Sequence, residues 1–248
     1  MDSPTPVALV TGAAHRLGAH TARHLHRRGW NLVIHYRSRQ DQAQALANEL
    51  NKVRDNSAIT LQADLSRPDQ IAPLAENAIA TWGRLDGLVN NASVFYPNSM
   101  EDADGDDWDT VMGTNLRAPF FLVQACLPAL RKSRGAIVNL IDIYSQRPLA
   151  DHPLYCASKA GLAALTQSWA KDLAPDVRVN GVSPGAILWP EGDAGMDPQQ
   201  QQAILNKTPL QRTGEPADIA GAIAFLLCDA PFITGQILAV DGGRSLNM

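Results

Sequence analysis

The 248-residue chain has few cysteines and no long hydrophobic run. Its three cysteines, Cys126, Cys156 and Cys228, lack CxxC spacing, which argues against a disulfide framework and against a zinc site. No apolar run reaches the roughly 18 residues that a membrane span needs. The first residues, MDSPTPVALVTG, lack the basic region and apolar stretch of a signal peptide. We therefore expect a cytoplasmic protein that does not enter membranes.

The chain also lacks an excess of positive charge. Its net charge is −4, which argues against nucleic acid or an anionic membrane surface as the main partner. His20 and His24 stand four residues apart on a predicted helix and could hold a metal ion. No cysteine or carboxylate follows them at ligand spacing, so we predict solvent-facing histidines and no metal.

Short apolar runs alternate with amphipathic stretches along the whole chain. The predicted strands are 7–10, 31–36, 58–63, 85–90, 135–141, 177–183 and 236–240. The predicted helices are 16–28, 40–53, 68–82, 106–132, 153–173 and 216–228, with Pro119 as a possible kink between two helices in 106–132. Residues 186–207 are predicted to be a loop with a short helix.

This alternation predicts the fold class. Continuously apolar strands joined by helices are typical of a parallel sheet that is covered on both faces. No linker divides the chain, so we predict one doubly wound α/β domain over residues 1–248. Ligands of such folds bind beyond the carboxyl ends of the strands, which places the chemistry just after residues 10, 36, 63, 90, 141 and 183.

The turn after the first predicted strand, TGAAHRLG (11–18), is typical of a dinucleotide site. Gly12 permits a tight turn and Gly18 lets the following helix pack closely, so that free N–H groups face a pyrophosphate. Arg16 stands where a middle glycine is usual. The second predicted strand ends in HYRSR (35–39), where an NAD site usually has an acidic residue. Arg37 and Arg39 suit a 2′-phosphate at that ribose, and Arg16 is expected near the same ribose edge, so together they predict NADPH. Residues 37–39 could instead be a solvated loop.

Three further segments lie at predicted strand ends or on a helix. Asp64 could accept hydrogen bonds from adenine, or could cap the helix that begins near Pro68. The small residues of NNAS (90–93) would let the backbone run beside the cofactor. In YCASK, Tyr155 and Lys159 share one helix face, where the ammonium would lower the pKa of the phenol and make Tyr155 a general acid.

Several motifs in this order resemble the short-chain dehydrogenase/reductase family over the whole chain. They are TGxxxxxG, NNA, an Asn in the long helix (Asn115), YxxxK, PG (184–185) and the closing VDGG (240–243). The resemblance implies a Rossmann-type domain with about seven strands, hydride transfer from a nicotinamide, and a homotetramer. It implies that Tyr155 donates a proton, that Lys159 holds the nicotinamide ribose, and that Asn115 supports a water relay. The predicted cofactor-binding residues are Gly12, Arg16, Leu17, Gly18, His35, Tyr36, Arg37, Ser38, Asp64, Leu65, Asn91, Ala92, Ser93, Lys159, Pro184 and Gly185.

One departure from the family pattern concerns the substrate. The family normally has a serine thirteen residues before the tyrosine, and this chain has Asp142. An ionised carboxylate cannot donate a hydrogen bond to a carbonyl, but it can accept one from N–H groups. Ser145 is a possible substitute for the missing serine.

An Asp–Tyr–Lys set resembles the pteridine reductases of this family, as do TGAAHRLG, HYRS, NSAITLQADLS and NNASVFYP. The resemblance implies a pterin stacked between the nicotinamide and Phe95, with Ser93 touching pterin and cofactor, and a loop over 186–207 that carries Trp189. Phe95 and Tyr96 could instead be packing residues. A basic residue that some relatives have near the C-terminus is matched by Met248. The predicted catalytic residues are Asn115, Asp142, Tyr155 and Lys159, and the predicted substrate-binding residues are Ser93, Phe95, Asp142, Tyr155 and Trp189.

The predicted function is therefore NADPH-dependent reduction of a pterin or folate substrate. One alternative is a ketone or 3-oxoacyl reductase of the same family, which Asp142 disfavours. A second is a non-catalytic NADP(H)-sensing protein, which has no need of Tyr155, Lys159 and Asn115.

Overall fold

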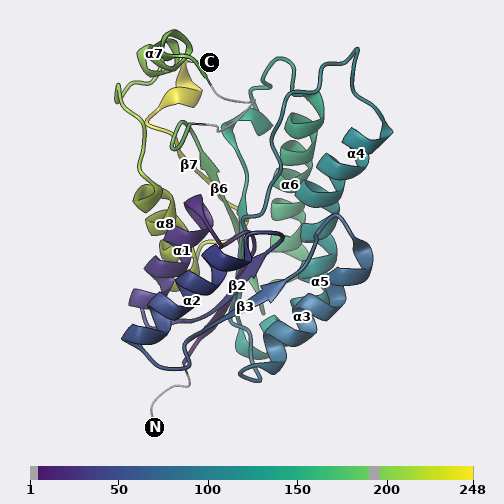
Figure 1. Ribbon diagram of the computed structural model, residues 1–248, viewed down its shortest axis with the longest axis vertical. Coiled ribbons are helices and arrows are strands. Elements are labelled where there is room, and N and C mark those ends of the chain that lie inside the picture. Colours follow the sequence, from purple (N-terminus) through teal and green to yellow (C-terminus); the bar gives the residue numbers. More distant parts are fainter. Residues whose placement is uncertain (1–4, 190–195, 248) are drawn as a thin grey trace.

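The computed structural model describes residues 5–189 and 196–247 (Figure 1). Its strands are β1 (Val7–Val10), β2 (Asn31–Tyr36), β3 (Ala58–Gln62), β4 (Gly87–Asn90), β5 (Ala136–Leu140), β6 (Arg178–Pro184) and β7 (Ile237–Val240). Its helices are α1 (Arg16–Arg27), α2 (Gln40–Val53), α3 (Ile71–Ala80), α4 (Gly105–Met112), α5 (Ala118–Ser133), α6 (Pro153–Asp172), α7 (Pro198–Asn206) and α8 (Pro216–Ala224). No helix in these two segments is long and apolar enough to cross a membrane.

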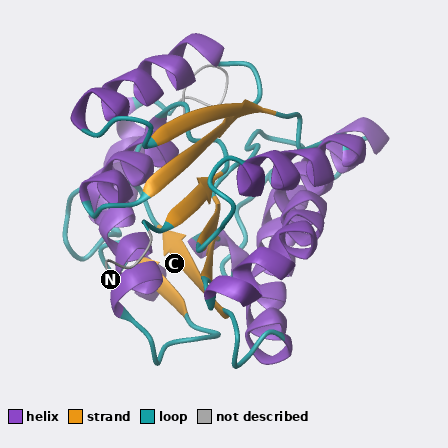
Figure 2. Ribbon diagram, turned by 90° about the horizontal axis from the view of Figure 1, so that it is seen from below, coloured by secondary structure: helices purple, strands orange, loops and turns teal. Residues whose placement is uncertain are grey.

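All seven strands form one parallel sheet in the order β3-β2-β1-β4-β5-β6-β7. Strand order reverses between β1 and β4, which is the switch point where doubly wound sheets bind ligands. Figure 2 shows helices on both faces of the twisted sheet. The predicted α/β Rossmann-type fold is confirmed.

Alternation along β1 explains the two helical layers. Ala8 and Val10 are fully buried against one core, which includes residues of α1, α2 and α8. Val7 and Leu9 are fully buried against the other core, which includes residues of α3, α5 and α6. Figure 1 shows these two groups of helices on opposite sides of the sheet. Because successive strand side chains point to opposite faces, a strand covered on both sides is apolar throughout.

The predicted helix over 106–132 is interrupted, but not at Pro119. The chain passes from α4 into a π-helical turn over Gly113–Arg117 and then into α5. In that turn the N–H of Ala118 donates to the carbonyl of Gly113. Pro119 lies in the first turn of α5, where its missing N–H does not kink the chain. The irregular turn contains Asn115, one of the predicted catalytic residues.

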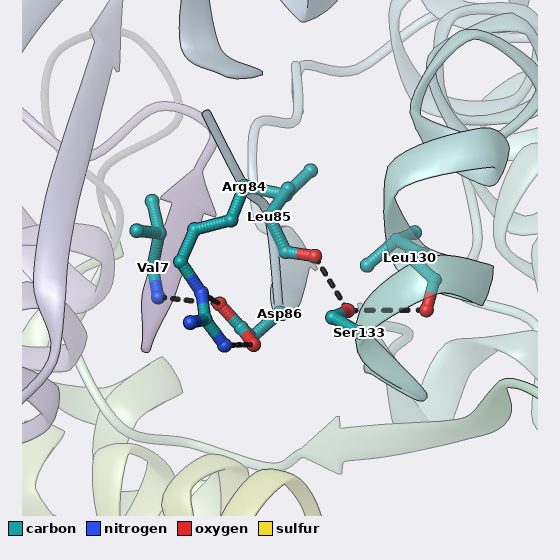
Figure 3. Close-up of polar contacts among 6 residues, drawn as sticks. All are labelled: Val7, Arg84, Leu85, Asp86, Leu130 and Ser133. Carbon is teal, nitrogen blue, oxygen red and sulfur yellow. Dashed lines mark hydrogen bonds and ion pairs between the residues drawn. The ribbon is translucent and has the colours of Figure 1, made fainter. Parts of the chain in front are cut away.

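The amino edge of the sheet is held by an ion pair beside β4 (Figure 3). Arg84 donates to both carboxyl oxygens of Asp86, at 2.8 and 2.6 Å. The backbone N–H of Val7 donates to the same carboxylate at 2.9 Å. Ser133 at the end of α5 donates to the carbonyls of Leu85 (2.7 Å) and Leu130 (3.1 Å). These bonds join the starts of β1 and β4 to the end of α5.

Candidate active site

A cleft of about 390 Å³ lies at the carboxyl edge of the sheet, around the switch point. It is lined by the turn after β1 and by the loops after β2, β3 and β4. The predicted cofactor residues that line it are Gly12, Arg16, Leu17, Gly18, His35, Tyr36, Arg37, Ser38, Asp64, Leu65, Asn91, Ala92 and Ser93. Lys159, Pro184 and Gly185 do not line this cleft, and Gly185 lies instead on a neighbouring one.

The turn between β1 and α1 requires glycine at two places. Gly12 has a φ of +61°, and a side chain there would be strained against Ala92. A Cβ on Gly18 would lie 2.4 Å from the carbonyl oxygen of Gly12, too close for any other residue. Asn91 donates to the carbonyls of Thr11 (2.7 Å) and Gly12 (3.1 Å), which pins this turn to the loop after β4. The backbone at the start of α1 is therefore shaped for close approach of a ligand phosphate.

His35 holds this turn in place through a hydrogen bond to its backbone. The N–H of Gly12 donates to Nδ1 of His35 at 3.0 Å, and Nε2 lies 3.0 Å from the carbonyl oxygen of Ala63. Those two partners select the tautomer with the proton on Nε2. Burial lowers the pKa of His35 to about 4, so the ring is neutral near pH 7. Both ring nitrogens of His35 are occupied by the backbone, so the side chain positions the turn, and His35 also lines the cofactor cleft. A contact between His35 and the cofactor stays a prediction.

Arg16 reaches the neighbouring cleft as well as the cofactor cleft. Its Nη2 donates to the carbonyls of Leu188 (3.2 Å) and Trp189 (3.1 Å). Arg37, Ser38 and Arg39 line the cofactor cleft, whereas Arg16 lines both clefts. The prediction placed Arg16 at the ribose edge with these residues. In the structure its guanidinium extends toward the segment after β6.

Asp64 does not cap the next helix, which is one of the two readings of its sequence position. Its carboxylate accepts from the N–H (3.0 Å) and hydroxyl (2.7 Å) of Ser66. Arg67 is the N-cap residue before Pro68 and makes no side-chain cap. Asp64 closes a local turn and lines the cofactor cleft.

A second cleft of about 350 Å³ adjoins the first. All five predicted substrate-binding residues line it: Ser93, Phe95, Asp142, Tyr155 and Trp189. Ser93 and Arg16 line both clefts, so a cofactor in one would lie beside a substrate in the other. Ser145, the possible substitute for the missing serine, is not among the described residues that line either cleft.

Two predicted catalytic residues, Asp142 and Tyr155, line this cleft, and Lys159 lies near the Tyr155 ring without lining the cleft. The hydroxyl of Tyr155 donates to Oδ2 of Asp142 at 2.7 Å. The N–H of Tyr144 donates to Oδ1 of the same carboxylate at 2.9 Å. Nζ of Lys159 donates to the carbonyl of Leu140 at 2.9 Å and lies 5.7 Å from the centre of the Tyr155 ring. The strand that precedes Asp142 and the helix α6 thus bring an acid, a base and a cation together.

The sequence predicted that Lys159 lowers the pKa of Tyr155, but in the structure this pKa is raised. Burial raises the pKa of Tyr155 well above its ordinary value, and the nearby Asp142 carboxylate raises it further. Burial also raises the pKa of Asp142 and lowers that of Lys159 to about 8. The i,i+4 spacing predicted the shared helix face but not this burial. Tyr155 is therefore held in its protonated, proton-donating form.

Asn115 lies outside both clefts and joins their walls. Its Oδ1 accepts from the N–H of Val94 (2.9 Å) and the hydroxyl of Ser93 (3.2 Å). Its Nδ2 donates to the carbonyl of Val94 (3.0 Å) and the hydroxyl of Ser158 (3.2 Å). The side chain therefore connects the loop after β4 to α6. A water relay through Asn115 stays a prediction.

Phe95 forms an aromatic wall of the second cleft. Its ring stacks on His152 with centroids 4.6 Å apart and meets the edge of Tyr155 at 4.8 Å. Trp189, Met196 and Ile204, which belong to the predicted covering loop, also line the cleft. Part of the predicted covering loop, residues 190–195, and Met248 lie outside the described residues.

Sequence reasoning missed two polar residues of this cleft, Tyr144 and Arg244. They are 100 positions apart, and Nη2 of Arg244 donates to the hydroxyl of Tyr144 at 3.2 Å. The available signal was the position of this arginine directly after VDGG, beyond the carboxyl end of a predicted strand, where ligands of such folds bind.

Comparisons with known proteins place the chain in a family. A family model described as enoyl-(acyl carrier protein) reductase matches residues 12–245. Pteridine reductase 1 of Leishmania tarentolae is 36% identical, over 98% of this chain and 98% of that protein. The chain belongs to the short-chain dehydrogenase/reductase family. A 3-oxoacyl-(acyl-carrier-protein) reductase FabG of Staphylococcus epidermidis is also 36% identical, over 95% of this chain and 97% of that protein.

A solved structure shares the fold of this chain. It is a blue fluorescent protein from a metagenomic library in complex with NADPH, 34% identical, with a TM-score of 0.89 over 96% of this chain and 97% of that one. With the family pattern of Tyr155 and Lys159, this chain is an NAD(P)H-dependent reductase of a small-molecule substrate. The two relatives named above differ in the substrate that their names give, a pteridine in one and a 3-oxoacyl-(acyl-carrier-protein) in the other.

Proposed function

We propose that the protein is an NADPH-dependent pteridine reductase that converts a dihydropterin to a tetrahydropterin. The observation that carries the proposal is Asp142, which lies on the substrate cleft beside Tyr155 where the family pattern has serine. A carbonyl oxygen needs hydrogen-bond donors, and a carboxylate would repel the alkoxide that forms from a ketone. A pterin ring presents N–H groups and basic nitrogens, which suit a carboxylate.

The residues of the cofactor cleft fit NADPH. Glycines 12 and 18 admit a phosphate close to the first turn of α1, and Arg37 with Ser38 would hold the ribose phosphate. NADPH supplies the hydride when it is bound.

The substrate residues have distinct roles in this proposal. Phe95 stacks on the flat ring, because aromatic faces favour offset stacking. Asp142 accepts hydrogen bonds from ring N–H groups. Tyr155 donates a proton to a ring nitrogen it can reach, and Lys159 offsets the negative charge that remains. Hydride to carbon and a proton to nitrogen together reduce one C=N bond.

A 3-oxoacyl reductase is the second candidate, because the FabG relative is as similar as the pteridine reductase. In that case Tyr155 alone would donate to the carbonyl oxygen. As in the pterin reaction, its hydroxyl, which donates to Asp142 in the structure, would have to turn toward the substrate.

The test is NADPH oxidation by the purified protein, followed at 340 nm. Dihydrobiopterin, dihydromonapterin, dihydrofolate and a β-ketoester are compared in parallel, and each assay is repeated with NADH. We expect turnover of a dihydropterin with NADPH and much less with NADH. Turnover of the ketoester alone would replace the proposal with a carbonyl reductase, and preference for NADH would contradict the assigned roles of Arg37 and Ser38.

A further inference from the structure

Arg244 is a buried cation on the substrate cleft, and part of its guanidinium has no hydrogen-bond partner among the residues that the structure describes. It follows β7, is 8% exposed and lines the cleft. Its Nη2 donates to the hydroxyl of Tyr144 at 3.2 Å. Within residues 5–189 and 196–247, its Nε and Nη1 have no hydrogen-bond partner. Burying a charged group without partners is costly, so such an arrangement needs an explanation.

Arg178 shows how the guanidinium of a partly buried structural arginine is usually satisfied by hydrogen bonds. Arg178 at the start of β6 is structural, and its guanidinium is surrounded by backbone carbonyls. Its partners are the carbonyls of Leu226 (2.7 Å), Leu227 (2.9 Å), Ala230 (3.0 Å) and Ile233 (3.5 Å). In the described part of the chain the one hydrogen-bond partner of Arg244 is the hydroxyl of Tyr144, and Arg244 lines a cleft that Arg178 does not line. Its remaining donors are therefore suited to a ligand.

The position of Arg244 limits which part of a ligand it can reach. Tyr144 bonds to Asp142 through its backbone N–H and to Arg244 through its hydroxyl. The guanidinium thus lies within about one tyrosine side chain of the catalytic carboxyl group. A group bound there is close to the reacting ring and not at the end of a long tail. A guanidinium has only donors, so that group must carry acceptor oxygens.

We propose that Arg244 is a specificity-determining residue that donates hydrogen bonds to the oxygens of a short substituent on the substrate ring. The inference rests on the proposed function, in which Asp142 and Phe95 hold a pterin ring. The substituent is a hydroxyalkyl or a carboxylate group. The two positive charges of Arg244 and Lys159 outnumber the one negative charge of Asp142. This excess of positive charge favours a carboxylate as the substituent.

The test compares three substrates that differ only at the ring substituent: 6-methyl-, 6-hydroxymethyl- and 6-carboxy-7,8-dihydropterin. The proteins are the wild type, Arg244→Met, Arg244→Lys and the control Arg212→Met, which makes the same change at an arginine whose side chain is 59% exposed. We expect Arg244→Met to lower kcat/KM for one or both oxygen-bearing substrates by about 10- to 100-fold, mainly through KM. For the 6-methyl substrate, kcat/KM should change by less than about 3-fold. In the control Arg212→Met, kcat/KM should equal that of the wild type for all three substrates.

The outcomes separate the possibilities. If kcat/KM of Arg244→Met falls most for the carboxy substrate, the group that Arg244 binds is a carboxylate. If it falls most for the hydroxymethyl substrate, that group is a hydroxyl. Equal losses for all three substrates, or no loss, would overturn the proposal. If Arg244→Met does not fold, Arg244→Lys decides, because an ammonium lacks the fork of donors and should lose at least about 3-fold in selectivity.

The proposed function can fail separately. If the wild type reduces no dihydropterin, the same variants are assayed with acetoacetate and with 2-pentanone. Acetoacetate has a carboxylate where 2-pentanone has an ethyl group. A preference for acetoacetate that Arg244→Met removes would support the oxygen-binding site without the pterin. No such preference in the wild type would overturn the site as well.

Discussion

The two edges of the sheet use aspartate and arginine differently. At the amino edge, Asp86 accepts two bonds from Arg84 and one from the N–H of Val7 (Figure 3). At the carboxyl edge, Asp142 accepts from Tyr155 and from a backbone N–H, and Arg244 is bonded only to Tyr144 among the described residues.

This difference separates stability from function. At the amino edge, Arg84 and Asp86 neutralise each other, and Asp86 also fixes the first residue of β1. Because the carboxylate of Asp86 is taken up by these bonds, it is not available to a ligand. Incomplete pairing at the carboxyl edge costs folding free energy but leaves donors and acceptors for substrate and cofactor. Such trade-offs are common at binding sites. Substitutions at the two edges should therefore have opposite effects on stability and on turnover.

The largest effect is expected for Tyr155→Phe. Removing the phenolic hydroxyl removes the proton donor, and we expect kcat to fall by about 10² to 10⁴-fold. NADPH affinity, measured by fluorescence titration, should stay within about 3-fold, because Tyr155 lines only the substrate cleft. A variant that keeps more than a tenth of wild-type kcat would show that another group donates the proton.

Asp142→Ser should act on substrate choice. It removes the N–H acceptor and restores the usual serine of the family, so kcat/KM for a dihydropterin should fall about 10- to 100-fold. Turnover of a β-ketoester should rise, while NADPH binding is nearly unchanged. Unchanged dihydropterin turnover would contradict the role of Asp142.

Asp86→Ser makes the same chemical change at the other edge. It leaves Arg84 without its carboxylate and Val7 without its acceptor, so we expect the free energy of unfolding to fall by about 2–3 kcal/mol. Urea unfolding measures this loss, and kcat at 25 °C should match the wild type. A drop in kcat with unchanged stability would mean that the two edges are not independent.

His35 is predicted to make stability depend on pH. Its folded pKa of about 4 lies below its unfolded value, so only the unfolded state gains a proton as pH falls from about 6.5 toward 4. Stability should therefore decrease by about 2 kcal/mol between pH 7 and pH 5 through this residue. His35→Gln keeps one acceptor and one donor but does not titrate. It should remove that part of the pH dependence in urea unfolding, and an identical pH dependence would contradict the assignment.

Most of the fold follows from local patterns in the sequence. Apolar runs such as VALV and AIVNL identified buried strands, and Gly29, with a φ of +90°, follows the end of α1 close to the predicted helix boundary. The exception is the turn before α5. Pro119 suggested a kink, but tertiary packing places the irregular turn at Gly113–Arg117, where Asn115 is fully buried and bonds to two other segments. Local sequence does not reveal such packing.

The site was predictable where residues directly follow strands. The residues after β1, β2, β3 and β4 gather around one cleft because parallel strands end at the same edge. The raised pKa of Tyr155 and the partner of Arg244 were not predictable. Both depend on burial and on contacts between segments far apart in the chain, which spacing in the sequence does not encode.

The pairing of β1 with β4 has a consequence for folding. These strands are neighbours in the sheet, yet their paired residues, such as Val10 and Val89, come from distant parts of the chain. Strands β1, β2 and β3 can assemble from consecutive sequence, whereas long-range parallel pairing forms slowly. The substrate cleft needs residues from Arg16 to Arg244. Secondary structure should therefore return before catalytic activity during refolding, and a chain on the ribosome becomes competent only after its last strand has emerged.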